Sequence, residues 1–371
     1  MKKIFLIVFL LFNLKQLKAT EYQKMEVAIC ADLSSSTKGL LEAMRTNMWY
    51  LMHYLTSYQP QPDVRFGMVL YGKPGYGEKN DYNRLISDLG KRINSIQEEL
   101  YSTSVSEPAL ENFPEKALLK TIEELSWSEG TDVYKTIFFI GNGAINTSEL
   151  KKIAKAAKKK GIIVNAMYYK TYHNLAELNQ WTELAKALEV ELVVIDPTLV
   201  TPWEKDIKSS NTELMLQANE KYNNTFLYYG EGGYRRHQMY LQMDKYASES
   251  GKNCLELRFM YKISENYFGV NSDWDLIDYS MHASIDTTKL DKKLLPEQYR
   301  TMTFENILKV VERKKEERLY LRDIGNIYSS RNRILTHDYY QEYKGTVHRA
   351  LYFTILEVIN SQIDNYHLIL D

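Results

Sequence analysis

Cysteine, proline and glycine are scarce in this chain of 371 residues. It holds 2 Cys, 8 Pro and 17 Gly, which excludes a disulfide scaffold, a collagen-like repeat and a low-complexity chain. Neither Cys30 nor Cys254 has a further Cys or a His at ligand spacing, so the sequence offers no zinc or redox motif. Cys30 falls in a predicted buried strand, and we expect both residues to be free thiols. A hydrophobic content of 44% indicates a globular protein, and the length favours two domains.

Known catalytic motifs are also missing. The sequence contains no G-x-S-x-G, no H-E-x-x-H, no P-loop and no protein-kinase signature. The glycines of residues 72–77 surround Pro74 and do not open a helix, so this segment is interpreted as a surface loop and not as a phosphate cradle. The 7 histidines lack paired-ligand spacing. We therefore expect a protein that is not an enzyme.

The charge balance argues against nucleic acid as a partner. The formal net charge is −1, and residues 1–19 contain four lysines and no acid, so their removal takes the charge from −1 to −5. An acidic mature chain lacks the basic surface that binds phosphate backbones.

Residues 1–19 have the pattern of a secretory signal peptide. A basic start at Lys2 and Lys3 precedes an apolar stretch over 4–12 and a polar tail that ends at Ala19, a small residue suited to cleavage. The alternative is a membrane anchor, but the apolar stretch is about half of the roughly 20 residues that a spanning helix needs. We expect an exported protein, periplasmic or secreted, with no membrane span after cleavage.

The first part of the chain predicts an α/β fold. From Met25 to Asp196, short apolar runs alternate with segments of helical period, which is typical of a doubly wound, mostly parallel sheet with helices on both faces. An apolar stripe from Leu41 to Leu55 predicts the first helix. The expected strands span 26–31, 65–71, 135–141, 162–168 and 191–196. Further helices are expected over about 89–101, 115–125, 148–159 and 175–188.

After Pro197 the strand-like runs end and polar helical stretches such as 305–328 and 343–362 follow. We expect a main domain over 20–200 and a mainly α-helical region over 201–371. The basic residues of 309–322 alternate with acids, which predicts a solvated helix face with ion pairs. Residues 228–236 are interpreted as a glycine-rich turn between helices, with an anion site as the alternative. Trp274 is expected to pack a helix onto the main domain, with a recognition patch including Asp275 and Asp278 as the alternative.

Three oxygen-bearing side chains follow the first predicted strand. Asp32, Ser34 and Ser36 alternate along the chain, so in an extended turn one carboxylate and two hydroxyls lie on the same side. The carboxyl end of a strand in an open α/β sheet is where ligands bind. Hard oxygen donors are typical of Mg²⁺ sites, which usually leave positions open for water or for a partner's oxygen. The alternative is that these residues cap the following helix.

This loop resembles the metal-ion-dependent adhesion site of von Willebrand factor type A (vWA) domains, which begins with Asp-x-Ser-x-Ser after the first strand. Tyr71-Gly72, the segment 111–115 and the strand 135–141 follow in the family's order. In that family the second loop supplies an acid or threonine ligand, and Asn112 stands in its place here. The fourth strand usually ends in Asp-Gly, where this chain has Asn142-Gly143.

The resemblance implies a metal site formed by Asp32, Ser34, Ser36, Asn112 and Asn142 that holds Mg²⁺ or Mn²⁺. Two amides in place of carboxylates keep oxygen ligands but remove charge, so the resemblance implies a cation that binds weakly or only with a partner's carboxylate. Short landmarks in the tail, among them Thr201-Pro202 and residues 274–278, resemble exported bacterial proteins in which this domain precedes a helical region.

Three hypotheses about function follow. The leading one is a protein-binding or adhesion module whose unidentified partner offers a carboxylate that completes the coordination of the cation. The second is an interaction protein of the same fold with a silent metal site that binds through its helical tail. The third is an exported metal-dependent hydrolase, which would require a second acid beside Asp32.

Overall fold

The computed structural model describes residues 24–37, 39–104, 113–130, 132–170, 174–196, 211–343, 351–363 and 369–370. The expected signal peptide (1–19) and the expected domain boundary near Thr201 lie outside these residues. Both remain predictions.

A six-stranded sheet forms the centre of the first part of the chain. Its strands are β1 (Lys24–Asp32), β3 (Asp63–Tyr71), β4 (Asn83–Gly90), β5 (Val133–Gly141), β6 (Ile163–Tyr169) and β7 (Val193–Ile195). The spatial order is β4-β3-β1-β5-β6-β7, and every neighbouring pair is parallel except β3 and β4. The expected doubly wound, mostly parallel sheet is confirmed. Because the chain leaves β1 towards β3 and later returns to β5, the switch in strand order lies beside β1.

Helices cover both faces of this sheet. They are α2 (Leu40–Leu55), α3 (Asn94–Ser102), α4 (Pro114–Glu124), α5 (Leu150–Lys160) and α6 (Leu175–Ala187). Val27 and Ile29 of β1 join the core formed with α2 and α3, whereas Ala28 and Cys30 join the core beneath α4, α5 and α6. A central parallel strand buried on both faces has no polar side, which is why β1 reads as a nearly continuous apolar run.

The prediction of a helix over 89–101 is wrong at the start of that range. Residues up to Gly90 belong to β4, an edge strand antiparallel to β3, and α3 begins only at Asn94. Several β4 side chains are half-exposed, so the strand lacks the apolar run of its buried neighbours. An edge strand buries less apolar surface and therefore carries a weaker sequence pattern.

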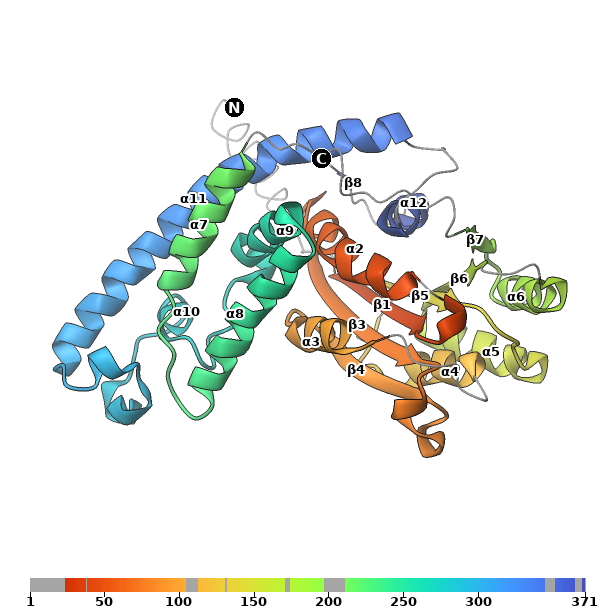
Figure 1. The fold of residues 1–371 in the computed structure, drawn as a ribbon, viewed down its shortest axis with the longest axis horizontal. Coiled ribbons are helices and arrows are strands. Elements are labelled where there is room, and N and C mark those ends of the chain that lie inside the picture. Colours follow the sequence, from red (N-terminus) through yellow and green to blue (C-terminus); the bar gives the residue numbers. More distant parts are fainter. Residues whose placement is uncertain are drawn as a thin grey trace, which may run out of the picture.

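The rest of the described chain is mainly helical. It contains α7 (Thr212–Asn224), α8 (Gly233–Glu249), α9 (Lys252–Ile263), α10 (Leu276–Ser280), α11 (Phe304–Tyr343), α12 (Leu351–Ile363) and the short strand β8 (Ile369–Leu370), which pairs with β2 (Tyr58–Gln59). Figure 1 shows α7, α8, α10 and α11 to one side of the sheet, while α12 returns to lie beside α2. Across these described segments, we find no helix with the length and apolar character needed to cross a bilayer.

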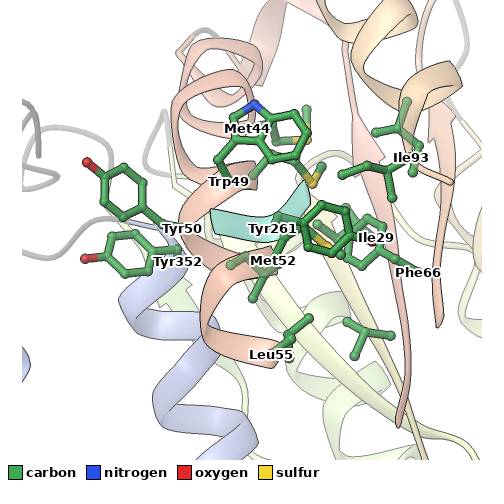
Figure 2. Packing of buried hydrophobic residues seen from close by; sticks show 14 of the residues in the cluster. Ile29, Met44, Trp49, Tyr50, Met52, Leu55, Phe66, Ile93, Tyr261 and Tyr352 are labelled. Atoms are coloured by element: carbon green, nitrogen blue, oxygen red, sulfur yellow. The ribbon is translucent and has the colours of Figure 1, made fainter. Parts of the chain in front are cut away.

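Helix α2 joins the two parts of the molecule because it packs against α9 and α12. Trp49 of α2 lies 6.1 Å from Tyr261 of α9, measured between ring centroids. Tyr50 of α2 stacks on Tyr352 of α12 at 5.1 Å. Figure 2 shows these aromatic pairs in one continuous core with residues of the sheet. The helical region therefore packs on the same face of the sheet as α2.

Two expectations about the helical region need correction. Trp274 is buried, but its ring stacks on Phe226 at 5.4 Å, so it packs inside the helical region and not onto the sheet. The face over 309–322 is not fully solvated, because Arg318 and Arg322 are buried. Arg318 pairs with Asp275, a long-range contact that the local charge pattern does not contain. The glycine-rich turn expected over 228–236 does connect two helices, α7 and α8.

Candidate functional site

Asp32 is the last residue of β1 and is completely buried. Its Oδ1 accepts a hydrogen bond from the backbone N–H of Ser34 at 2.7 Å. The hydroxyl of Thr37 donates to the carbonyl oxygens of Asp32 and Ser34 at 3.0 and 2.9 Å. These bonds fix the turn that follows the strand from within.

Ser34, Ser36 and Asn142 form a chain of hydrogen-bonded oxygens next to this turn. The Ser34 and Ser36 hydroxyl oxygens are 2.6 Å apart, and the Ser36 hydroxyl donates to Asn142 Oδ1 at 2.7 Å. Asn142 Nδ2 donates back to the Ser36 carbonyl at 3.1 Å and to the Tyr169 carbonyl at 3.2 Å. Four of the five expected site residues therefore come together where β1 and β5 end. The fifth, Asn112, lies outside the described residues.

Asp32, Ser34 and Ser36 do not cap the first long helix, which was the alternative interpretation of these residues. Helix α2 begins at Leu40, its N-cap is Gly39, and no side chain makes a capping hydrogen bond there. Residues Ser35–Thr37 instead form a short 3-10 turn between the strand and the helix. The serine hydroxyls are directed to one another and to Asn142, so their arrangement has a cause other than capping.

Two glycines allow the carboxylate of Asp32 to lie this close to the backbone. A Cβ on Gly72 would lie 2.4 Å from Asp32 Oδ1, and Gly72 also has a positive φ of 78°. A Cβ on Gly141 would lie 2.7 Å from Asp32 Cβ and 2.2 Å from the Tyr71 hydroxyl oxygen. Any side chain at either position would displace Asp32. Sequence reasoning used both glycines only as landmarks and missed this role.

The surroundings keep the nearby ionisable groups neutral. Burial raises the pKa of the Cys30 thiol to about 12, so it stays protonated. Burial, together with the charge of Asp32, also raises the pKa of Tyr71 well above its ordinary value. Neither the Cys30 thiol nor the Tyr71 hydroxyl therefore adds a negative charge beside Asp32.

The donor set fits a hard divalent cation. Mg²⁺ takes oxygen ligands at about 2.0–2.1 Å in octahedral geometry, which places neighbouring ligand oxygens about 3 Å apart. The separations of 2.6 and 2.7 Å along Ser34, Ser36 and Asn142 need to open by only a few tenths of an ångström. Among the residues that the structure describes, no three or more His, Cys, Asp or Glu side chains gather as a metal site. A cation here would therefore rely mainly on neutral oxygens.

Glu115 is a buried acid at the same edge of the sheet that sequence reasoning did not assign to a site. It lies in the first turn of α4 and is 6% exposed, and its Oε2 accepts a hydrogen bond from Asn146 N at 3.5 Å. Burial raises its pKa above the ordinary value for Glu. The only signal in the sequence was the acid after Pro114 at the start of a predicted helix.

Trp181 of α6 reaches the same edge from the other side. Its indole N–H donates to the carbonyl oxygen of Gly143 at 3.0 Å, next to Asn142. The ring is fully buried and stacks on Phe139 of β5 at 4.8 Å. The loop that carries Asn142 is thus held in place by α6.

Comparison with known proteins finds similarity in structure only. No family model matches the chain, and no curated protein matches its sequence. Among solved structures, proximal thread matrix protein 1 from the mussel byssus, determined with a zinc-occupied MIDAS motif, is 15% identical over 47% of this chain and 41% of that chain, with a TM-score of 0.36. The alignment thus covers less than half of the mussel protein.

Two further matches cover most of a smaller structure. The SpRpn10 VWA domain is 14% identical over 48% of this chain and 90% of that chain, with a TM-score of 0.36. BatB from Bacteroides thetaiotaomicron is 18% identical over 46% and 90%, with a TM-score of 0.33. The class of fold of this chain follows from the strand order and connections described above.

Proposed function

We propose that this protein is a non-enzymatic interaction module that binds a protein partner through a divalent cation. In this proposal Asp32, Ser34, Ser36 and Asn142 hold Mg²⁺ or Mn²⁺, and Asn112 is a further ligand. A carboxylate from the partner occupies a remaining position on the cation. The protein acts after export, in the periplasm or outside the cell.

One observation carries the proposal. The oxygens of Ser34, Ser36 and Asn142 follow one another at 2.6 and 2.7 Å beside the turn fixed by Asp32. These side chains come from loops after β1 and β5, on either side of the switch in strand order, where open α/β sheets bind ligands. Hydroxyl and amide oxygens are ligands that Mg²⁺ and Mn²⁺ accept.

The charge of the donor set explains why a partner carboxylate is needed. Asp32 supplies one negative charge against the two positive charges of the cation, while Ser34, Ser36 and Asn142 supply none. A second carboxylate from the partner would balance the site and take the place of bound water. Cation and partner are therefore expected to bind more tightly together than either binds alone.

The test is a calorimetric titration of Mn²⁺ into the mature protein, with and without a glutamate-containing peptide. Ser36→Ala removes the hydroxyl that connects Ser34 to Asn142 and should weaken Mn²⁺ binding at least about tenfold. Ser35→Ala is the matched control, because Ser35 is the intervening serine and its side chain is not part of the chain of oxygens. Equal Mn²⁺ affinity in the two variants would overturn the proposal.

The second hypothesis, binding through the helical region, has its own supporting observation. Helix α11 exposes four large apolar side chains in its described part. They are Leu308, Leu319, Tyr320 and Ile327. Tyr320 and Ile327 are seven residues apart and so lie on one side of the helix. If a partner still binds Asp32→Asn but no longer binds Tyr320→Ser, the second hypothesis replaces the first.

The hydrolase hypothesis has less support. It requires a second acid beside Asp32, and Glu115, a second buried acid at this edge, contacts Asn146 and not the serines. A phosphate-ester hydrolysis assay with Mg²⁺ tests it directly.

A further inference from the structure

A groove of about 560 Å³ lies beside the oxygen cluster, along α4. Its walls come from residues just before β4, from α4 and from the turn after β5. Lining residues that matter for its chemistry are Asp81, Asn83, Glu115, Lys116, Asn146 and Glu149. Asp32 and the two serines are not among its lining residues, so the groove is a separate feature of the same edge.

Two of the lining side chains are buried acceptors. Asn83 is 4% exposed, and within the described chain its Oδ1 has no hydrogen-bond partner. Its Nδ2 donates to the carbonyl of Asp81 at 3.4 Å. Glu115 is 6% exposed, and its carboxylate accepts hydrogen bonds from its own backbone N–H and from that of Asn146, the latter long at 3.5 Å. Buried acceptors without good donors are costly, so this groove favours a ligand that brings N–H groups.

Three of the four lysines that line the groove, Lys116, Lys120 and Lys152, pair with other acids, and the fourth, Lys79, is exposed and lies in no ion pair among the described residues. Lys116 is exposed and pairs with Asp81 at 2.5 Å, with its ammonium 4.3 Å from the centre of the Phe113 ring. Lys152, also exposed, pairs with Glu149 at 3.5 Å. Glu115 forms no ion pair with either of them. Its carboxylate is the negative group that remains at the base of the groove.

The register of the sheet sets the distance between the groove and the oxygen cluster. Tyr71 of β3 is paired with Asp32 of β1 on one side and with Asn83 of β4 on the other. Neighbouring strands lie about 4.8 Å apart, so Asp32 and Asn83 are separated by about 10 Å. One extended segment of a partner spans that distance with about three residues.

We propose that this groove binds an organic cation, a guanidinium or primary ammonium group, through the carboxylate of Glu115 and the amide oxygen of Asn83. The site goes beyond the proposed function and stands whether or not the oxygen cluster holds a metal. The cation has two possible sources, an arginine or lysine side chain of a protein partner or a free small amine. In the first case the partner carries its basic residue within about three residues of the acid that reaches the oxygen cluster.

The direct test uses acetyl-arginine amide as the probe, because it has a guanidinium but no carboxylate and needs no metal. Binding is followed by the NMR shifts of the protein, with acetyl-citrulline amide as the uncharged probe of the same shape. Acetyl-arginine amide should bind. Acetyl-citrulline amide should bind at least about tenfold more weakly, because its uncharged urea group cannot form charge-assisted hydrogen bonds. Equal binding of the two probes would overturn the proposal.

Variants locate the probe on the protein. Glu115→Gln should weaken binding of arginine amide about tenfold, while Glu220→Gln, which changes an exposed acid on α7 outside the groove, should leave it unchanged. Asn83→Asp adds a second carboxylate and should strengthen binding. This gain keeps the test decisive if Glu115→Gln folds poorly. Binding that is equal in Glu115→Gln and Glu220→Gln contradicts the assignment.

A third arm separates the two sources of the cation. If the cation belongs to a protein partner, a peptide with Glu and Arg two residues apart should bind more tightly than arginine amide in the presence of Mn²⁺, and Ser36→Ala should remove the gain. If the cation is a free amine, peptide and amide should bind equally and spermidine should bind at least as well. Failure of Mn²⁺ binding alone leaves the arginine amide result intact, so the two proposals fail separately.

Discussion

The carboxyl edge of the sheet and the helical region treat buried acids in different ways. At the carboxyl edge of the sheet, Asp32 and Glu115 are buried beside hydroxyls, amides and backbone groups, and Glu115 lies in no ion pair among the described residues. In the helical region, buried acids face cations directly. Glu115 thus lies among neutral hydrogen-bond donors, whereas Asp244 and Asp275 of the helical region lie against cations.

The helical region contains two such balanced clusters. Asp244 accepts hydrogen bonds from Arg258 at 2.5 Å and from Lys262 at 2.9 Å, and Asn219 and Asn223 complete the group. In the second cluster Arg318 pairs with Asp275 and donates to Thr225 at 2.8 Å. These ions join α7, α8, α9 and α11 without an external ligand. The contrast indicates that the helical clusters are structural, and it gives the proposed cation site at the sheet edge a direct test.

The largest effect should come from breaking the balance in the helical region. Asp244→Asn leaves Arg258 and Lys262 buried without a carboxylate and should lower the free energy of unfolding by about 3–5 kcal/mol. Urea unfolding followed by circular dichroism measures this. Glu305→Gln, which removes an exposed pair with Lys309, should cost less than about 0.5 kcal/mol. A similar loss of unfolding free energy in the two variants would mean that Asp244 does not compensate the charges of Arg258 and Lys262 in the folded protein.

The carboxylate of Asp244 should also make the free energy of unfolding depend on pH. Burial alone would raise the pKa of Asp244, but the nearby Lys262 and Arg258 charges lower it below its ordinary range. Because the pKa is lower in the folded state, this contribution to stability is present above pH 4 and is lost as the pH falls below that value. Unfolding measured from pH 6 to pH 2 should show a steeper acid decline for the parent than for Asp244→Asn. Parallel curves would contradict the assignment.

Gly72→Ala tests how tightly the sheet edge holds Asp32. Its Cβ would meet Asp32 Oδ1 at 2.4 Å, whereas Gly161 has a positive φ of 66° in the left-handed region and no atom within 4 Å of its Cβ position. In both alanine variants the positive φ should lower the free energy of unfolding by about 1–2 kcal/mol. The clash should add about 1–3 kcal/mol at Gly72 alone. Thermal unfolding of the two variants measures the difference. Equal losses of stability would show that the Asp32 side chain moves away from the new Cβ at no cost.

Asn142→Asp sharpens the comparison by adding charge where the edge has little. The second carboxylate should raise Mn²⁺ affinity at least about tenfold. Without the cation it should cost more than about 1 kcal/mol, because the carboxylate repels Asp32 and cannot donate to the Ser36 and Tyr169 carbonyls as Asn142 Nδ2 does, and Mn²⁺ should restore part of that loss. Asn146→Asp adds the same charge to an exposed position four residues later and serves as the control. If both variants gain equal affinity, the effect comes from net charge and not from coordination.

Glu115→Gln should have the smallest effect on stability. Burial raises the pKa of Glu115 in the folded state, so its ionised form opposes folding as the pH rises above the ordinary pKa of Glu. Removing the charge should therefore stabilise the free protein at pH 7, by less than about 0.5 kcal/mol. Thermal unfolding at pH 7 and pH 4 checks the sign. A clear destabilisation at pH 7 would indicate that Glu115 already has a cationic partner.

The fold was predictable where the sequence pattern reflects burial. Strands β1 and β5 are buried on both faces, so their apolar runs stand out, and the stripe of α2 marks its packed face. Strand β4 was missed because its pairing with β3 leaves one edge open and its side chains half-exposed. Arg318 was placed on a solvated face because its partner, Asp275, is distant in the chain.

The oxygen cluster was predictable for a similar reason. Asp32, Ser34 and Ser36 are close in sequence, and Asn142 follows a recognisable central strand, so the topology of a parallel sheet brings them to one edge. The groove was not predictable in this way. Asn83 reaches the edge only through the antiparallel register of β3 and β4, and short-range patterns do not encode that register.

The bond from Trp181 to the Gly143 carbonyl gives the protein a built-in optical reporter. An indole that donates to the loop of Asn142 senses small shifts of that loop as a change in emission. If the proposed cation binds, the part of the emission change that is lost in Trp181→Phe, which keeps the other four tryptophans, reports on this loop without a label. The same signal distinguishes ligands that move this loop from ligands that fill only the neighbouring groove.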